Sequence, residues 1–320
     1  MNPAGPSLRR DALSTASAVR RPGFVRTAFL LLLIGLLGCQ SAPAQDGEMK
    51  DLSGTGIDPS RYLDTISRLA SDEMEGRRVG TPGGWAAIAF MEARFREAGL
   101  LPPEALGGYL QLYTHDWHGK TDAANVIGVL PGSNPALEDE VVVVSAHHDG
   151  LGRNRDDGCP DGRRGKRIRY GANDNASGMA ALVELAFALA ARRDEIARTI
   201  VFLSIDGEEC GCTGVKHYVF KDPVYPLEKT VYVLNIDQIG EGAWLVEHPT
   251  DHHAADSEDC MVDGEVFARR GVRATTLVGD NSNYHRPGDV IEKLNMRKAL
   301  EAVRRAHELV LHAARPDGGD

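Results

Sequence analysis

The chain has 320 residues, of which 42% are hydrophobic and 26% are charged, a composition typical of an ordinary globular protein. Its formal net charge at pH 7 is −10. This acidic balance argues against a nucleic acid as the partner, because proteins that bind nucleic acids carry a basic surface.

The first 39 residues have the pattern of an export signal. Three arginines at positions 20–26 precede the uncharged stretch 27–39, whose apolar core is shorter than the roughly 20 residues of a membrane-spanning helix. Such a core suits the hydrophobic region of a signal peptide. The stretch ends in the letters LLGC, which resemble the cleavage box of bacterial lipoproteins. We therefore expect a lipid anchor on Cys39; the alternative is an ordinary signal peptide with an incidental cysteine.

The residue after Cys39 bears on location. Gln40, rather than an aspartate, favours sorting to the outer membrane of a Gram-negative cell. The expected location is therefore the periplasmic side of the outer membrane, with secretion as the alternative.

Three segments follow the signal. Residues 40–57 are small, polar and aperiodic, which predicts a flexible tether. Residues 58–315 are enough for one α/β domain with a sizeable core, and residues 316–320 form a short tail.

Four cysteines lie beyond the signal: Cys159, Cys210, Cys212 and Cys260. An exported chain permits disulfides, and an even number fits one or two of them, but the pairing cannot be deduced from sequence. A soft metal site at Cys210 and Cys212 is less favoured, because no second cysteine pair follows at the spacing of a zinc site.

Helix and strand signals alternate along the domain and predict an open α/β sheet. Helices are predicted at 82–100, 175–193 and 295–314, and strands at 124–130, 140–146, 199–205, 229–236 and 271–278. The strand 140–146 is rich in β-branched residues and is predicted to be central. The helix 175–193 is apolar on nearly every face, so it should pack against the sheet.

Imidazoles and carboxylates follow the carboxyl ends of the predicted strands, where open α/β sheets bind their ligands. In chain order they are His147, His148, Asp149, Asp174, Glu208, Glu209, Asp237, His285 and Asp289. Histidines and carboxylates without a thiolate suit a pair of divalent ions, and zinc fits this mixed set. Two ions about 3.5–4 Å apart can share a carboxylate and a water, as in two-metal hydrolases.

Five motifs in this order resemble the M28 family of zinc exopeptidases, over about residues 60–312. The matching stretches are HHD at 147–149, GANDNASG at 171–178, EECG at 208–211, NIDQIG at 235–240 and YHRPGD at 284–289. The stretch 69–102 is similar to the N-terminal part of that family. The resemblance implies a single three-layer α/β/α domain with a mixed, mostly parallel central sheet.

The resemblance also implies a role for each side chain. Asp174 would bridge two zinc ions, His147 and Asp237 would complete one site, and Glu209 and His285 would complete the other. Glu208 would be the general base, and Asp149 would accept a hydrogen bond from the ring of His147. The peptide bond between Asp174 and Asn175 would be cis.

Two departures from the family pattern stand out. Gly264 lies where histidine is usual, and Arg273 lies where proline is usual. The basic stretch 153–169 is a long insert between two ligand motifs. It is interpreted as a solvated loop, with a clamp for a substrate carboxylate as the alternative.

The expected function is an aminopeptidase that removes N-terminal residues from peptides. The alternatives are a carboxypeptidase, a glutaminyl cyclase, which shares this fold, and a surface lipoprotein without catalysis. None of the expected ligands is missing, which argues against a lipoprotein without catalysis. The DNASG stretch, which cyclases tend to lose, is intact, which argues against a cyclase. Neither the preferred side chain nor the oligomeric state follows from the sequence.

Other candidates are interpreted as structural or as open. His307 and His312 are expected at the surface of the last helix. His248, His252 and His253 are expected in a polar loop, with the mouth of the site as the alternative. His148 should point away from His147 if the strand pleat persists. Tyr284 is a candidate to polarise the substrate carbonyl.

Overall fold

The computed structural model describes residues 52–116, 119–137, 139–153, 167–250 and 260–317. All of these residues belong to the unit Glu48–Asp320. The predicted signal with Cys39, most of the tether, Cys159, His252 and His253 lie outside the described residues. No helix among the residues described is long and apolar enough to cross a membrane.

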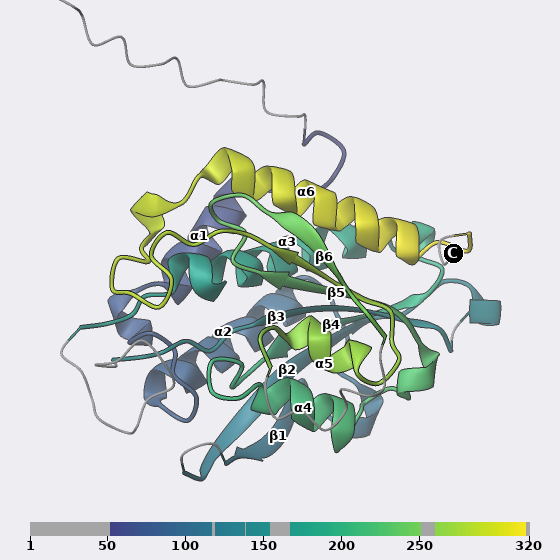
Figure 1. Cartoon of the computed structure of the whole chain (residues 1–320). Coiled ribbons are helices and arrows are strands. Elements are labelled where there is room, and N and C mark those ends of the chain that lie inside the picture. The colour runs from purple at the N-terminus through teal and green to yellow at the C-terminus, as the bar shows by residue number, and fades with distance from the viewer. Residues whose placement is uncertain (1–51, 117–118, 138, 154–166, 251–259, 318–320) are drawn as a thin grey trace, which may run out of the picture. The chain divides into compact units, whose positions relative to one another are not determined.

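A seven-stranded sheet in the order β1-β2-β4-β3-β5-β7-β6 forms the centre of the domain (Figure 1). Its strands are β1 Leu110–His115, β2 Thr121–Leu130, β3 Val141–His147, β4 Thr199–Ile205, β5 Thr230–Asp237, β6 Trp244–His248 and β7 Ala274–Val278. The central pairs β4–β3, β3–β5 and β5–β7 are parallel, and the outer pairs are antiparallel. The predicted mixed sheet is confirmed, and the strand predicted at 140–146 is central as β3.

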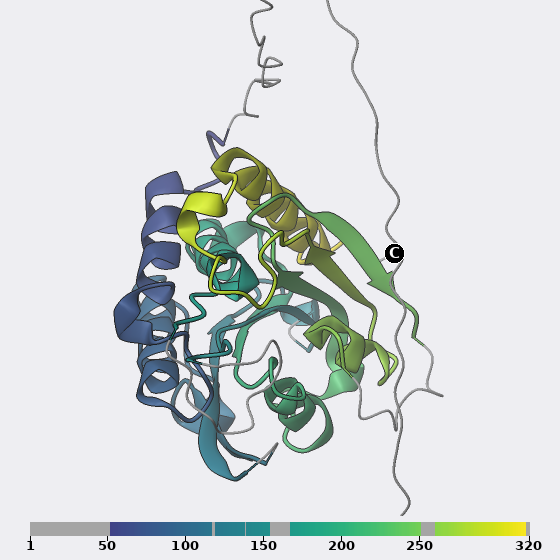
Figure 2. The ribbon, with the colours of Figure 1, turned by 60° about the vertical axis from the view of Figure 1, so that its left-hand side comes forward.

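Helices cover both faces of the sheet and complete the three predicted layers (Figures 1 and 2). One face is covered by α1 Pro59–Leu69, α2 Pro82–Glu97, α3 Gly178–Ala190 and α6 Met296–Ala313, and the other by α4 Thr213–Phe220 and α5 Asp263–Ala268. The pleat of β3 divides its valines between the two cores: Val142 and Val144 face the first set of helices, and Val141 and Val143 face the second.

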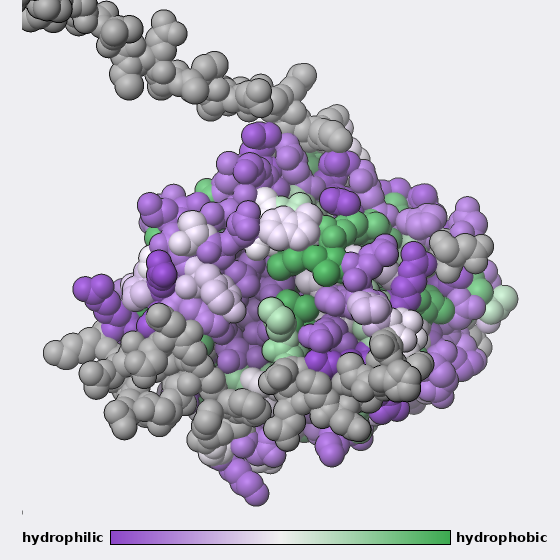
Figure 3. All heavy atoms as spheres, in the orientation of Figure 1, coloured by the Kyte–Doolittle hydropathy of each residue, from purple (hydrophilic) through white to green (hydrophobic). Residues whose placement is uncertain are grey.

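The three helices and five strands predicted from the sequence are all present, with ends that differ by a few residues. The elements α1, β1, α4, β6 and α5 were not predicted. The edge strand β6 alternates poorly between buried and exposed residues, so its period-2 signal is weak. Its Val246 is 36% exposed. Figure 3 shows a hydrophobic group on an otherwise mostly hydrophilic face of the domain.

The last residues assigned to the tether pack against the domain. Ile57 is buried and Leu52 is partly buried against the same core as α3. Because these apolar side chains are covered, the packed domain extends from Asp58 back to at least Leu52.

A buried ion pair fixes α1 on α3. The guanidinium of Arg61 donates from Nε to Glu184 Oε1 at 2.8 Å and from Nη2 to Oε2 at 2.7 Å. The backbone N–H of Asp58 donates to the same carboxylate at 2.7 Å, and the Glu184 side chain is fully buried. The pair therefore satisfies a charge that α3 carries into the core.

Arg61→Ala should lower the free energy of unfolding by about 3 kcal/mol, because it leaves a buried carboxylate without its cation. Denaturant unfolding of purified protein measures the change. Arg68→Ala is the matched control, since Arg68 and Glu73 form an exposed pair and should contribute about 0.5 kcal/mol or less. Equal losses in the two variants would show that Glu184 does not depend on Arg61.

Candidate metal centre

The carboxyl ends of the parallel strands meet at one edge of the sheet and bring the predicted ligands together. His147 is the last residue of β3, and Asp237 is the last residue of β5. Glu208 and Glu209 lie in the turn between β4 and α4, and His285 lies in the loop after β7. All five side chains, with Asp174, therefore come from segments that end or begin at this edge.

Asp174 lies in an irregular turn that precedes α3. Residues Ala172–Ser177 form one π-helical turn in which Asp174 and Asn175 have non-helical backbone angles. The peptide bond between these two residues is cis, as predicted. The side chain of Asn175 donates to the carbonyl of Ile236 at 2.9 Å and so joins this turn to the end of β5.

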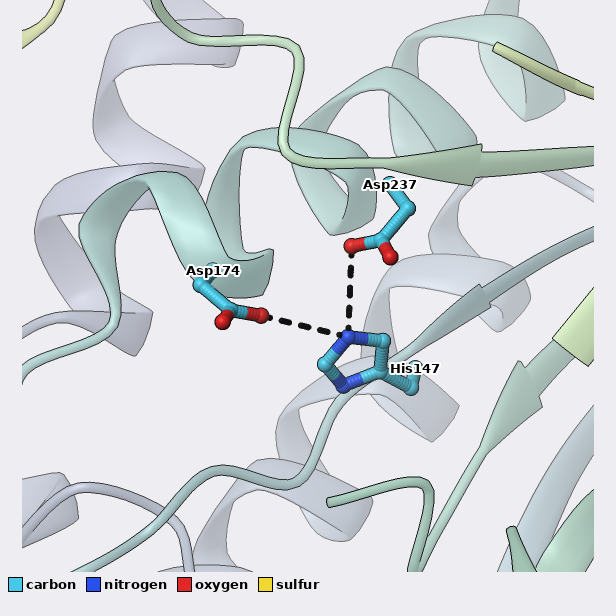
Figure 4. Close-up of side chains that lie close together, drawn as sticks. All are labelled: His147, Asp174 and Asp237. Atoms are coloured by element: carbon cyan, nitrogen blue, oxygen red, sulfur yellow. Dashed lines mark ion pairs between the residues drawn. The ribbon is translucent and has the colours of Figure 1, made fainter. Parts of the chain in front are cut away.

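The ligands form two trios that share Asp174. In the first, His147 Nε2 lies 3.4 Å from Asp174 Oδ1 and 3.4 Å from Asp237 Oδ1 (Figure 4). In the second, His285 Nε2 lies 3.5 Å from Asp174 Oδ2 and 3.0 Å from Glu209 Oε2. Within each trio, one ligand atom of each residue lies within 4.8 Å of the other two. Each carboxylate oxygen of Asp174 thus faces a different histidine.

The donor set fits a pair of divalent cations. Asp174 Oδ2 and Asp237 Oδ1 are buried and have no hydrogen-bond partner among the described residues. A buried carboxylate is costly unless it is paired or binds a metal. Imidazole nitrogens and carboxylate oxygens without thiolate favour zinc among the common metals.

Glu208 belongs to neither trio. Its Oε2 lies 3.9 Å from His147 Nε2, at the edge of the first trio. Its side chain is 12% exposed, whereas that of Glu209 is 4% exposed. The two adjacent glutamates therefore occupy different positions: one is within a trio, and the other stands beside the centre with access to solvent.

Asp149 acts on the glutamate turn as well as on the histidine. Its Oδ1 accepts the backbone N–H of Glu208 at 3.0 Å, and its Oδ2 accepts that of Glu209 at 3.2 Å. His147 Nδ1 lies 3.6 Å from Asp149 Oδ1 and 3.3 Å from the backbone carbonyl of Asp149. The expected contact with the ring is thus longer than a hydrogen bond to the carboxylate, because both carboxylate oxygens face the turn.

Two further residues position the centre and were not given this role from the sequence. Asp289 Oδ1 accepts the N–H of Asn173 at 2.7 Å, and its Oδ2 accepts the N–H of Asp174 at 3.0 Å. Arg77 is fully buried and donates to backbone carbonyls on both sides of the centre. Its acceptors are Leu69, His148, Tyr170 and Gly171, at 2.7–3.0 Å. Both act through backbone groups, which sequence patterns do not reveal.

The buried carboxylates raise one another's pKa values. Burial raises the pKa of Glu209 to about 7, and the charge of Asp174 adds to the rise. Burial likewise raises the pKa of Asp263 to about 8; its carboxylate oxygens have no hydrogen-bond partner among the described residues. Burial disfavours a charged His147, but Glu208 and the neighbouring aspartates outweigh it, and the pKa of His147 is raised. Such an excess of buried negative charge is what divalent cations would offset.

The structure shows whether four other histidines lie where the sequence predicted. His148 points away from His147 as expected, and its Nδ1 lies 2.8 Å from Ser204 Oγ. The expectation for His307 was wrong: it is 2% exposed, because it lies one helical turn after Val303 on the buried face of α6. His312 is exposed. The polar loop expected at His248 is also wrong, since this residue ends β6.

The place of Gly264 has a structural explanation. A Cβ at this position would come within 2.6 Å of Thr276 Oγ1 and 3.2 Å of His248 Nε2. His248 itself is hydrogen-bonded to Thr276 at 2.7 Å. The imidazole of β6 thus fills the space beside Gly264, where the family motif has a histidine.

The disulfide Cys212–Cys260 links the end of the glutamate turn to the segment before α5, with a Cα–Cα distance of 6.2 Å. Cys210 is also disulfide-bonded. The expectation of disulfides is confirmed, and it excludes Cys210 and Cys212 as a pair of soft metal ligands.

Tyr284 lies directly at the second trio. Its ring stacks on that of His285 with 3.7 Å between the centroids, and it is 52% exposed. The phenol is therefore open to solvent beside a proposed ligand.

Comparisons with known proteins agree with this geometry. Residues 125–247 match the family described as peptidase family M28. The alkaline phosphatase isozyme conversion protein of Escherichia coli is 25% identical over 236 residues, which cover 71% of this chain and 65% of that protein. The chain spans less than two thirds of the length of the curated relatives it matches.

Solved structures share the fold. An aminopeptidase from Aneurinibacillus sp. strain AM-1 matches with a TM-score of 0.61 at 16% identity, over 83% of this chain and 96% of that one. The glutaminyl cyclase of Tannerella forsythia matches with a TM-score of 0.62 at 16% identity, over 81% and 99%. The family match contains four of the five motifs and the first trio of ligands. These findings confirm the resemblance of the chain to peptidase family M28 and the α/β fold that this resemblance implies.

Proposed function

We propose that the protein is a zinc-dependent exopeptidase that removes N-terminal residues from peptides. The observation that carries this proposal is the pair of trios that share Asp174, with Glu208 beside them and in neither. His147, Asp174 and Asp237 would hold one zinc ion, and Asp174, Glu209 and His285 would hold the other. Bound zinc supplies a Lewis acid that polarises the scissile carbonyl and makes water a stronger nucleophile.

The protein's own groups supply positioning and proton transfer. The Glu208 carboxylate takes a proton from the attacking water and gives it to the leaving amine, the role of a general base and then a general acid. Asp149 holds the backbone of both glutamates, so it fixes where that carboxylate lies. Asp289 holds the backbone of Asp174 and thereby the shared ligand.

The choice of the amino end rests on charge. The trios contribute three carboxylates, which would hold the metal ions, and Glu208 contributes a fourth that is not a ligand. This free carboxylate and the formal net charge of −10 on the chain favour a substrate with an α-ammonium group. The fold is also that of a glutaminyl cyclase, so cyclisation of N-terminal glutamine is the second candidate.

Purified protein is expected to contain close to two zinc ions per chain and to lose activity on chelation, with recovery when zinc is added back. Elemental analysis and hydrolysis of free-amine peptides measure the two quantities. N-acetylated peptides of the same sequence are the control and should not be cut. Cleavage of the blocked peptides from their carboxyl ends would make the protein a carboxypeptidase, and full activity without metal would exclude the metal centre.

For the location, we propose export and a lipid anchor on Cys39, supported by the LLGC sequence behind the apolar stretch. The catalytic domain would then lie outside the cytoplasm, held at the membrane by residues 40–51.

A further inference from the structure

Two neighbouring hollows lie on the Asp174–His285 side of the centre. The smaller is lined by Leu151, Arg169, Gly171, Asp174, Glu209, His285, Arg286 and Asp289. The larger, of about 540 Å³, is lined by Asp72, Arg153, Arg167, Ile168, Tyr170 and Pro287. Each of the pairs 168–169 and 286–287 contributes one residue to each hollow, so the two hollows adjoin each other.

The cations of these hollows differ in how they are engaged. Arg153 Nε donates to Glu75 Oε1 at 3.1 Å, and Arg169 donates to the backbone carbonyl of His285. The guanidinium groups of Arg167 and Arg286 are exposed and have no hydrogen-bond or ion-pair partner among the described residues. Of these two guanidinium groups, that of Arg286 lines the hollow at the second trio and that of Arg167 lines the neighbouring cavity.

The acidic groups in the same lining are accounted for. Asp72 Oδ1 accepts the hydroxyl of Tyr170 at 2.7 Å. Asp174 and Glu209 belong to the second trio, and Asp289 accepts two backbone N–H groups. Each acidic group in the described lining thus already has a hydrogen-bond donor or a place in a trio. Among the described lining residues, the guanidinium groups left to meet an anionic ligand are those of Arg167 and Arg286.

Resting on the proposed function, we propose that Arg286 and Arg167 bind the C-terminal carboxylate of the substrate, and that the substrates are peptides of two or three residues. An arginine fork matches a carboxylate and forms charge-assisted hydrogen bonds with it. The arginines repel an α-ammonium group, so this side receives the part of the peptide that leaves.

Length follows from reach. An extended chain advances by about 3.3–3.6 Å per residue. Arg286 lines the hollow of the second trio itself, and Arg167 lines the neighbouring cavity. The proposal therefore assigns to them the carboxylate of a peptide in which only one or two residues follow the first bond. Arg167, at a described end of the insert, is thus the residue of that stretch that the proposal assigns to the carboxylate clamp.

The test compares trileucine with trileucine amide on the full chain loaded with zinc. Wild-type protein should prefer the free acid by about tenfold in kcat/KM, which corresponds to ~1.4 kcal/mol. The acid-to-amide ratio should fall in Arg286→Ala and in Arg167→Ala and approach one in the double variant. Because the ratio is taken within each protein, a general loss of activity cancels. Arg286→Lys should retain part of the preference.

Arg305→Ala on the exposed face of α6 is the matched control and should keep the wild-type ratio. Equal rates for acid and amide in the wild type would overturn the inference and leave the aminopeptidase intact. A wild-type ratio in the double variant would overturn the assignment to these two arginines. If the wild-type protein cuts none of the three substrates, trileucine, trileucine amide and leucine p-nitroanilide, the proposed function is overturned, and the inference with it.

Discussion

Glu208→Gln should lower kcat by about 10²–10⁴-fold, the usual share of general acid–base catalysis, while zinc content and KM change little. Glutamine keeps the shape and the backbone N–H groups that donate to Asp149. Its amide, however, cannot take a proton from water. Because Glu208 lies outside both trios, neither metal site loses a ligand. Steady-state kinetics and elemental analysis of the same preparation measure the two effects.

Glu209→Gln is the matched comparison for this prediction, since it changes the neighbouring residue in the same way. Glu209 Oε2 lies 3.0 Å from His285 Nε2 within the second trio. A neutral amide is a weaker ligand than a carboxylate, so one ion should be lost and activity should partly return in excess zinc. If Glu208→Gln loses zinc and Glu209→Gln keeps it, the two roles are reversed. If both variants are fully active, the site lies elsewhere.

The sequence was most informative where a mostly apolar segment, which predicts a buried strand, is followed at once by a candidate ligand. β3 and β4 are mostly apolar and buried throughout, so their ends could be predicted closely, and the residues just after them had to lie at the sheet edge. Parallel strands bring their carboxyl ends together whatever the distance along the chain, which places His147, Glu208 and Asp237 at one edge. The grouping into two trios around Asp174 was instead implied by the resemblance to the M28 family.

Contacts through backbone groups could not be predicted in the same way. The carboxylates of Asp149 and Asp289 accept hydrogen bonds from the backbone N–H groups of the turns that carry the ligands. Any residue supplies an N–H, so no residue pattern marks the acceptor. The prediction for His307 was wrong for a different reason. A polar residue on an amphipathic helix was assigned to the surface, although its spacing from Val303 placed it on the buried face.

Asp174→Asn should remove more metal than any other single change, because Asp174 is the residue that the two trios share. Zinc content should fall from about two ions to fewer than one, whereas Asp237→Asn should affect the first ion alone. Loss of several kcal/mol of transition-state stabilisation corresponds to a fall in kcat/KM of about 10³-fold or more.

Stability provides a readout of Asp174→Asn that does not depend on catalysis. Without metal, the charge of Asp174 raises the pKa of Glu209, so the two carboxylates repel each other in the folded protein. The metal-free variant should therefore be at least as stable as metal-free wild type. Zinc stabilises a folded state in proportion to its binding, so added zinc should raise the melting temperature of the wild type and raise that of the variant much less. Equal zinc-dependent shifts in the two proteins would show that Asp174 is not the shared ligand, and that the two trios bind their ions, if at all, without it.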